Sequence, residues 1–449
     1  MWYLDKEPAL RSTFSNLTIL DRPPDIARLR ARLAKAVQLV PRLRQRVVSP
    51  PVRLAPPEWA DDPGFDLDYH VRRLAVAAPG TDRQLFDLAA LLGEDPLDRA
   101  RPLWQFTVIE GLRGGRAALF QKMHHTFTDG EGGMRLSLMF LDIEPDADEA
   151  ARSDALGDDP EPEGPSGPLD VLRDTIVHRA QRRVRRSRQL VTTAAGAATH
   201  PMRIPALAEG AVGGARSLVR QALITEAARS PVWTGRSLRR RLDVLSVPLD
   251  EAKRAAKAMG GTVNDLFVAG VAGGAGAYHR AKGAPVDELR MAMPVSTRKE
   301  GATGQNAFTP TRVLVPAGEA DPMARFEEVR RRLGSTKSEP AVGLAEDLAG
   351  VLGLLPTSVL VRFAQQQAQT VDFATSNVRG SPVELYIAGA QILANYAMGP
   401  TAGTAFNVTL LSYRGSLDMG VHIDTAAVDD PDLLVRCLEN AFAELLDLG

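Results

Sequence analysis

The chain has 449 residues, of which 44% are hydrophobic, 24% charged and 5% aromatic, with 54 basic side chains against 55 acidic ones. This composition excludes a largely disordered chain, a collagen-like repeat and a disulfide scaffold, and at roughly 150 residues per domain the length allows two large domains or about three smaller ones. The formal net charge of -1 gives no overall attraction to nucleic acid, so we expect no nucleic-acid partner.

The cysteine count and the lengths of the apolar runs indicate in which cellular compartment the protein is expected. The single cysteine, Cys437, excludes an intrachain disulfide and a multi-cysteine metal site, and its apolar neighbours favour a small buried side chain over a reactive thiol. The first residues lack the basic and then apolar pattern of a secretory signal, and no run of about 18 uncharged apolar residues is present. We therefore expect a cytoplasmic protein whose membrane contact, if it has one, is peripheral.

The N-terminal third contains helical and strand patterns. Apolar side chains recur at helical spacing over residues 26–40 and 82–92. Residues 103–109 and 117–123 are rich in β-formers and are separated by a glycine-rich turn, which predicts a β-hairpin. A polar segment, 124–133, follows the second strand, so its side chains are expected at the end of a rigid sheet.

The middle of the chain differs in composition. Residues 142–168 are acidic and proline-rich, which is typical of a linker. Seven arginines follow within 173–188, and they form either a solvated helix face or a patch for an anionic phosphate of a cofactor or a lipid headgroup. Residues 191–229 are rich in Ala and Gly and are interpreted as loosely helical.

The C-terminal half again alternates strands and helices. A helix is predicted at 250–259, with Asp250 as its N-cap, and a tightly packed one at 262–278. The remaining predicted elements are strands at 241–248, 289–295, 311–315, 385–392, 404–412 and 417–423, and a closing helix at 430–448.

This order of elements predicts an α/β fold of two lobes with mixed β-sheets. We expect an N-terminal lobe over residues 1–145, a linker and basic helical connection over 146–235, and a C-terminal lobe over 236–449.

The segment KMHHTFTDGEGG, residues 122–133, carries the most chemical information. His124 and His125 are adjacent, and Asp129 follows four residues after the second histidine. A neutral imidazole can take the proton of an alcohol as that alcohol attacks an acyl carbon, and the glycines, among them Gly130 and Gly133, would let a substrate approach closely.

The residue pattern also allows two other interpretations of the histidines. They could be core or surface residues without a role, although a His-His pair beside Asp-Gly makes this the weaker reading. They could also bind a metal, but zinc needs a third donor and the other histidines show no paired ligand spacing. We therefore expect no metal ion.

The motif HHTFTDG at 124–130 resembles the HHxxxDG signature of the bacterial wax ester synthase/acyl-CoA:diacylglycerol acyltransferases, which share a chloramphenicol acetyltransferase-like fold. Condensation domains of nonribosomal peptide synthetases share this signature. The segment SNVRG, residues 376–380, departs from the common pattern by carrying Arg379 where proline is usual. Further segments that resemble the family, over about 60–449, are FDLDYHVRR at 65–73, Pro102-Leu103-Trp104, Asn264-Asp265, MPVSTR with Arg298, SNVRG with Ser376 and Asn377, and SYRGSLDMG from Ser412.

The resemblance implies two lobes with a tunnel between them and the motif at their junction. It also implies that His125 is the general base, that acyl-CoA is the donor, and that diacylglycerol or a long-chain alcohol is the acceptor. The products would be triacylglycerol or wax ester, and the reaction would need no cofactor beyond its acyl-CoA substrate. Such acceptors suggest peripheral contact with a membrane or a lipid inclusion.

The resemblance also implies roles for single residues. Asp129 would pair with Arg298 and fix the loop, and His124 would pack or orient it. Asn264 would either help to hold the oxyanion or cap the following helix. The remaining assignments are structural roles for Pro102, Leu103, Trp104 and Asp265, with Trp104 and Leu103 in the core, and substrate contacts for Gly130, Gly133, Ser376, Asn377 and Ser412.

Three other functions compete with this one. An acyltransferase of the same fold could act on a hydroxyl of a polyketide, a glycolipid or another secondary metabolite. A catalytically silent protein could bind lipid or CoA, although the intact His125 and Asp129 argue against it. A metal-dependent hydrolase is the third.

Overall fold

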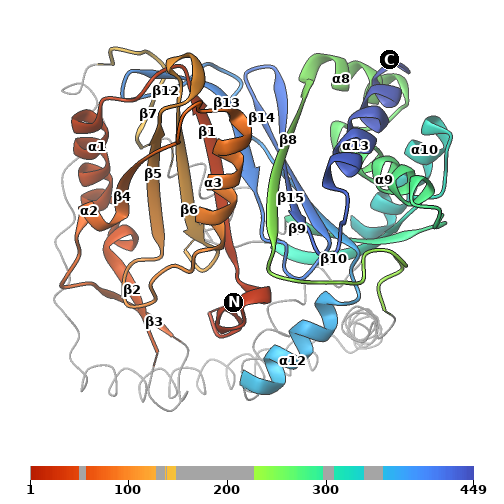
Figure 1. Ribbon diagram of the computed structural model, residues 1–449, viewed down its shortest axis with the longest axis horizontal. Coiled ribbons are helices and arrows are strands. Elements are labelled where there is room, and N and C mark those ends of the chain that lie inside the picture. Colours follow the sequence, from red (N-terminus) through yellow and green to blue (C-terminus); the bar gives the residue numbers. More distant parts are fainter. Residues whose placement is uncertain are drawn as a thin grey trace, which may run out of the picture.

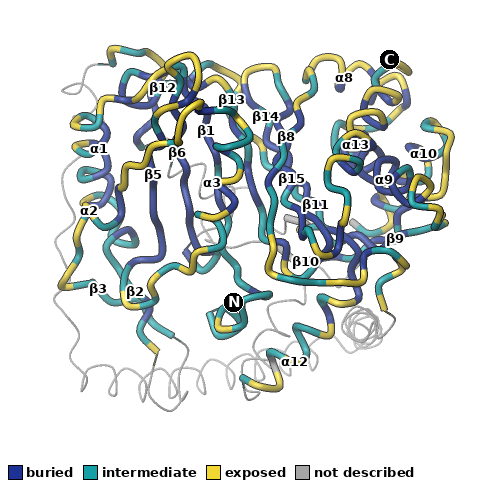
Figure 2. Tube along the Cα trace, in the orientation of Figure 1, coloured by how far each residue is buried: buried dark blue, intermediate teal, exposed yellow. Residues whose placement is uncertain are grey.

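The computed structural model describes residues 2–49, 57–127, 137, 139–147, 227–296, 308–337 and 357–449. These parts form a mixed α/β structure on two β-sheets that lie side by side (Figure 1). Many strand residues are buried, whereas helices and loops carry most of the exposed ones (Figure 2). The predicted α/β class with two lobes and mixed sheets is thus confirmed, while the arginines of 173–188 lie outside the described residues.

The first sheet has seven strands in the order β4-β5-β6-β1-β13-β12-β7. Neighbours are antiparallel except β4 and β5, which run parallel. The predicted hairpin is confirmed as β5 and β6. The strands are β1 (Thr13–Leu20), β4 (Val71–Ala75), β5 (Trp104–Glu110), β6 (Ala117–His124), β7 (Leu141–Asp142), β12 (Tyr386–Ile387) and β13 (Ala390–Met398).

Helices cover both faces of the first sheet, and the two predicted ones are confirmed. Helix α1 (Ile26–Leu39) places Leu29 and Leu33 in a core with the sheet. Helix α3 (Asp82–Glu94) begins at a capping box of Thr81 and Gln84 and packs on the other face. Smaller elements are α2 (Leu67–His70), the paired strands β2 (Gln45–Val48) and β3 (Glu58–Asp61), and the 3-10 turns η1 (Leu4–Lys6), η2 (Pro8–Leu10), η3 (Pro41–Arg44) and η4 (Arg113–Gly115).

The second sheet has six strands in the order β10-β9-β11-β14-β15-β8. Strand β11 runs parallel to both of its neighbours, and the other pairs are antiparallel. The predicted strands at 241–248, 289–295, 311–315, 404–412 and 417–423 are confirmed. The strands are β8 (Arg240–Pro248), β9 (Leu289–Ser296), β10 (Phe308–Val315), β11 (Phe373–Val378), β14 (Phe406–Tyr413) and β15 (Ser416–Asp424).

Most helices of the C-terminal half pack around α9, whose glycines allow close approach, whereas α12 contacts the N-terminal turns η1 and η2. A Cβ atom at Gly274 would lie 2.7 Å from the Cα atom of Leu438, so glycine lets α13 pack directly against α9. Cys437 on α13 is buried as predicted, and burial raises the pKa of its thiol. The helices are α8 (Leu249–Ala258), α9 (Val263–Ala281), α10 (Pro322–Lys337), α12 (Thr357–Ala368) and α13 (Pro431–Leu446).

The predicted start of α8 is wrong. Asp250 lies inside the first turn, and the N-cap is Pro248, which offers no side-chain cap. The reason is that β8 runs directly into the helix, where the backbone N–H of Leu249 donates to the carbonyl oxygen of Gly415. The turn between β14 and β15 thus satisfies the N–H of the first helical residue, and the helix begins one residue before Asp250.

The single strand predicted at 385–392 is also wrong. Ala388 and Gly389 have φ angles of 46° and 87°, so they form a two-residue turn between β12 and β13. The two strands complete the first sheet, between β1 and β7, although they come from the segment expected in the C-terminal lobe.

The junction of the two sheets is packed from both sides. Helix α3 contacts β8, and a core cluster there combines Leu17, Leu85 and Leu242. The N-terminal turns lie at the lower edge of the junction (Figure 1). Among the described residues, no helix has both the length and the apolar character needed to cross a bilayer.

Candidate active site

The histidine pair lies at the end of β6, as the sequence predicted. His124 is the last strand residue, pairs with Thr13 of β1 and donates its backbone N–H to the carbonyl oxygen of Leu103 at 3.1 Å. The chain then turns, and Phe127 donates its N–H to the carbonyl oxygen of His124 at 2.8 Å. Strand pairing and this turn fix the backbone on both sides of His125.

His125 is held by the N-terminal segment. Its backbone N–H donates to the carbonyl oxygen of Ser12 at 2.8 Å. Its imidazole lies against the ring of Phe14, with centroids 4.7 Å apart and planes tilted by 40°. The residue is half-buried, and its Nδ1 atom is buried. The Nδ1 edge of the ring is therefore closed to solvent.

His124 occupies a different environment. Only 1% of it is exposed, and its Nε2 atom lies 3.0 Å from Oδ1 of Asp5. Its Nδ1 atom accepts the backbone N–H of Thr126 at 3.0 Å. The sequence predicted that His124 orients the loop, but not its partner Asp5, because no local pattern connects the two positions.

Four predicted residues of the loop system lie outside the described residues. They are Asp129, Gly130, Gly133 and Arg298. The Asp129–Arg298 pair and the role of the glycines therefore stay predictions.

The Pro102-Leu103-Trp104 segment lies in the core beneath the motif. Leu103 and Trp104 are each 1% exposed, and the indole N–H of Trp104 donates to the carbonyl oxygen of Leu43 at 2.8 Å. The Trp104 ring stacks on His70, whose Nδ1 lies 2.7 Å from the carbonyl oxygen of Trp104. Burial lowers the pKa of His70, so this histidine is a neutral core residue.

The Asn264 side chain meets Asn377, one of the predicted substrate contacts. The Asn377 amide donates to Oδ1 of Asn264 at 3.1 Å. Asn264 is not the N-cap of α9, because Thr262 caps that helix in a reciprocal capping box with Asp265. A hydroxyl followed three residues later by a carboxylate is the signal that identifies this cap.

The other predicted contacts of the C-terminal half lie near this pair. The Ser412 hydroxyl accepts the backbone N–H of Gly380 at 3.2 Å, and Ser376 lies on β11 opposite Thr409 of β14. Within the described residues, the polar contacts of Asn264, Asn377 and Ser412 do not reach His125. A shared role with His125 in catalysis stays a prediction.

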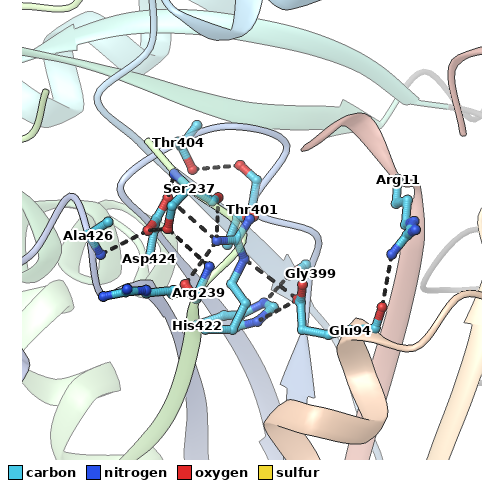
Figure 3. Close-up of polar contacts among 11 residues, drawn as sticks. Arg11, Glu94, Ser237, Arg239, Gly399, Thr401, Thr404, His422, Asp424 and Ala426 are labelled. Carbon is cyan, nitrogen blue, oxygen red and sulfur yellow. Dashed lines mark hydrogen bonds and ion pairs between the residues drawn. The ribbon is translucent and has the colours of Figure 1, made fainter. Parts of the chain in front are cut away.

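A polar cluster joins the two lobes beside the N-terminal segment (Figure 3). Arg240 of β8 lies 3.4 Å from Oδ2 of Asp424 and 3.6 Å from Oε1 of Glu94, at the end of α3. Asp424 also accepts the N–H and hydroxyl of Ser237. Burial, helped by the charge of Arg240, lowers the pKa of His422 to about 4, so that imidazole is neutral near pH 7.

Arg11 connects this cluster to the N-terminal segment that holds the histidine pair, because it donates to the Glu94 carbonyl oxygen at 2.9 Å. In the parts of the chain that are described, no three His, Cys, Asp or Glu side chains are grouped to hold a metal ion.

The sequence matches known families over most of its length. Residues 7–267 match the wax ester synthase/diacylglycerol acyltransferase catalytic domain, and residues 305–446 match the WS/DGAT C-terminal domain. A Mycobacterium tuberculosis H37Rv protein named as a diacylglycerol O-acyltransferase is 38% identical over 447 residues, which cover 99% of this chain and 90% of the relative. A second protein of that strain, named for the same activity, is 30% identical over 449 residues, covering 96% and 91%.

Solved structures show the same two-lobed fold. The wax ester synthase/diacylglycerol acyltransferase from Marinobacter aquaeolei VT8 aligns with a TM-score of 0.65 and 22% identity over 100% of this chain and 98% of that one. The first condensation domain of the calcium-dependent antibiotic synthetase aligns with a TM-score of 0.59 and 16% identity over 99% and 94%. The sequence matches establish the family as well as the fold. The chain belongs to the wax ester synthase/diacylglycerol acyltransferase family.

Proposed function

We propose that this chain is an acyl-CoA-dependent O-acyltransferase in which His125 is the general base on the hydroxyl of diacylglycerol or a long-chain alcohol. The observation that carries the proposal is the placement of His125 after β6. Its backbone is anchored to Ser12, its ring lies on Phe14 and its Nδ1 atom is buried. Family membership supplies the class of reaction.

The proposed reaction transfers one acyl group and one proton. Nε2 of His125 accepts the hydroxyl proton while the acceptor oxygen attacks the thioester carbonyl carbon. The tetrahedral adduct then collapses, the carbon–sulfur bond breaks, and the imidazolium returns its proton to the CoA thiolate. The products are an ester and CoA thiol, so atoms, protons and electrons balance without a resident cofactor. We therefore propose no cofactor.

The base assignment is tested with His125→Ala. Because positioned acid–base catalysis contributes about 100-fold or more, we expect release of CoA thiol from palmitoyl-CoA to fall by at least that factor with dioleoylglycerol or 1-hexadecanol as acceptor. The melting temperature should stay at the wild-type value, and His200→Ala, a histidine change outside the motif, should keep full activity. Substantial turnover by folded His125→Ala would refute the assignment.

The acceptor class is tested separately, at fixed palmitoyl-CoA, with a panel of diacylglycerol, long-chain alcohols and short alcohols. We propose that diacylglycerol or a long-chain alcohol gives the highest rate and that the enzyme meets these water-insoluble acceptors at a lipid surface. Flotation with anionic phospholipid vesicles, at low and high salt, tests that contact. Rates that stay at background for the whole panel would favour a secondary-metabolite or glycolipid hydroxyl instead.

A further inference from the structure

We propose that Asp5 is a positioning residue for acyl transfer: its carboxylate holds His124 and, through the turn that follows, the imidazole of His125. The proposal rests on the function proposed above for His125. Asp5 lies in the 3-10 turn η1, far from the histidines in the sequence, and the pairing of β1 with β6 brings the two segments together.

The first link joins two side chains. Nε2 of His124 lies 3.0 Å from Oδ1 of Asp5, and the side chains are only 2% and 13% exposed. Nδ1 of the same ring accepts the backbone N–H of Thr126 and lies 2.8 Å from the Thr126 hydroxyl oxygen, so Nε2 is the ring nitrogen beside the carboxylate. The imidazole therefore connects Asp5 to the turn that carries His125.

The second link runs through the backbone. Ser12 donates its N–H to Oδ1 of Asp5 at 3.3 Å, and the Ser12 carbonyl oxygen accepts the N–H of His125 at 2.8 Å. One carboxylate oxygen thus contacts both the ring beside the base and the residue before β1 that holds the base. Carboxylates behind a histidine commonly fix its tautomer and orientation in this way.

Asp5 is itself held in place. Nη1 of Arg99 lies 4.0 Å from its Oδ2 atom. The same guanidinium donates to the Trp2 carbonyl oxygen at 3.0 Å and lies 3.5 Å above the Trp2 ring. Burial raises the pKa of Asp5, but the contacts with His124, Ser12 and Arg99 outweigh it and bring the pKa below its usual value. The anchor is therefore an ionised carboxylate at neutral pH.

The charge of Asp5 is removed with Asp5→Asn, which keeps the size of the side chain. We expect kcat to fall about 10- to 100-fold, since a small misplacement of a catalytic group costs rates of this order. The KM for acyl-CoA should stay unchanged, because Asp5 contacts His124 and not the substrate.

A double-mutant cycle shows whether Asp5 acts through His124. If it does, Asp5→Asn combined with His124→Gln should lose no more kcat than the more impaired single variant. Asp5→Glu, which keeps the charge, should recover part of kcat. Lys6→Gln, an exposed position in the same turn, should behave as wild type, and melting temperatures show whether each variant folds.

Wild-type kcat in folded Asp5→Asn, a loss that appears in the KM for acyl-CoA instead of kcat, or losses that multiply in the double variant would each overturn the proposal. The His125→Ala experiment fails or succeeds independently. A failed Asp5 experiment therefore rejects the positioning role of Asp5 but leaves His125 as the base. An active His125→Ala variant instead rejects His125 as the base, and the positioning role falls with it.

Discussion

Lys122 on β6 is a buried cation that caps a helix end. Its Nζ atom donates to the carbonyl oxygens of Leu92 and Asp95 at 2.7 and 3.0 Å, at the end of α3. Burial, the largest influence, lowers its pKa to about 8 from 10.5. Between these values the unfolded chain binds more protons than the folded one, so this group makes the free energy of unfolding rise with pH from about 8 to about 10.5.

We therefore expect the stability of the wild type relative to Lys122→Met to increase by about 1.4 kcal/mol per pH unit, at most, over that window. Denaturant unfolding at a series of pH values measures the difference. Lys253→Met, at an exposed position on α8, should show no such slope relative to the wild type. A difference that is flat between pH 8 and 10 would contradict the lowered pKa.

At the scale of single residues, the sequence predicted where the histidines lie better than what they contact. The adjacent histidines and their place after a strand could be read from the motif, because both are local. Asp5 could not be found, since its contact with His124 exists only after β1 pairs with β6. The Asp129–Arg298 pair stays a prediction.

Substitution by alanine should change the free energy of unfolding in opposite directions at two helix glycines. A Cβ atom at Gly276 in α9 would lie 1.7 Å from the carbonyl oxygen of Ala317, whereas one at Gly334 in α10 would meet nothing within 4 Å. We expect Gly276→Ala to lower the free energy of unfolding by about 3 kcal/mol, because backbone cannot yield to overpacking as a side chain does. Gly334→Ala should raise it by up to about 1 kcal/mol through helix propensity.

Thermal and denaturant unfolding of both variants measure these changes, with the wild type alongside. Gly276→Ala as stable as the wild type would show that α9 can move away from Ala317. That outcome would contradict the close packing described here.

At the scale of elements, periodicity predicted α1, α3, α9 and α13 because each carries its own apolar pattern, but it did not predict the helices α10 and α12 or the strands β1 and β11. It misplaced the start of α8, where Gly415 of another segment satisfies the Leu249 N–H. It also missed the turn at Ala388 and Gly389, whose φ angles are positive although only one of the two residues is glycine.

The contact between the lobes depends on a buried arginine. Arg240 is 3% exposed and lies between Asp424, which is 1% exposed, and Glu94 of the first lobe. Arg240→Met should cost about 3 kcal/mol of stability, because it leaves the Asp424 carboxylate buried without its cation. Denaturant midpoints measure the loss, and Arg331→Gln, whose partner Glu328 lies on the same helix, serves as the exposed control. Equal midpoints for Arg240→Met and the wild type would contradict this role.

At the scale of the whole molecule, alternating strands and helices predicted two lobes with mixed sheets. They could not predict that β12 and β13, which come from the C-terminal half of the sequence, belong to the first sheet. Strand pairing across the chain depends on which edges remain unpaired after folding, and no local pattern of residues records that choice.

The place of β13 beside β1 constrains how the protein is made. A ribosome releases β1 first, and β13, the strand that pairs with its second edge, begins about 370 residues later. Until then the nascent chain carries an open β edge that other chains could join, and chaperone protection or delayed collapse would have to cover the interval.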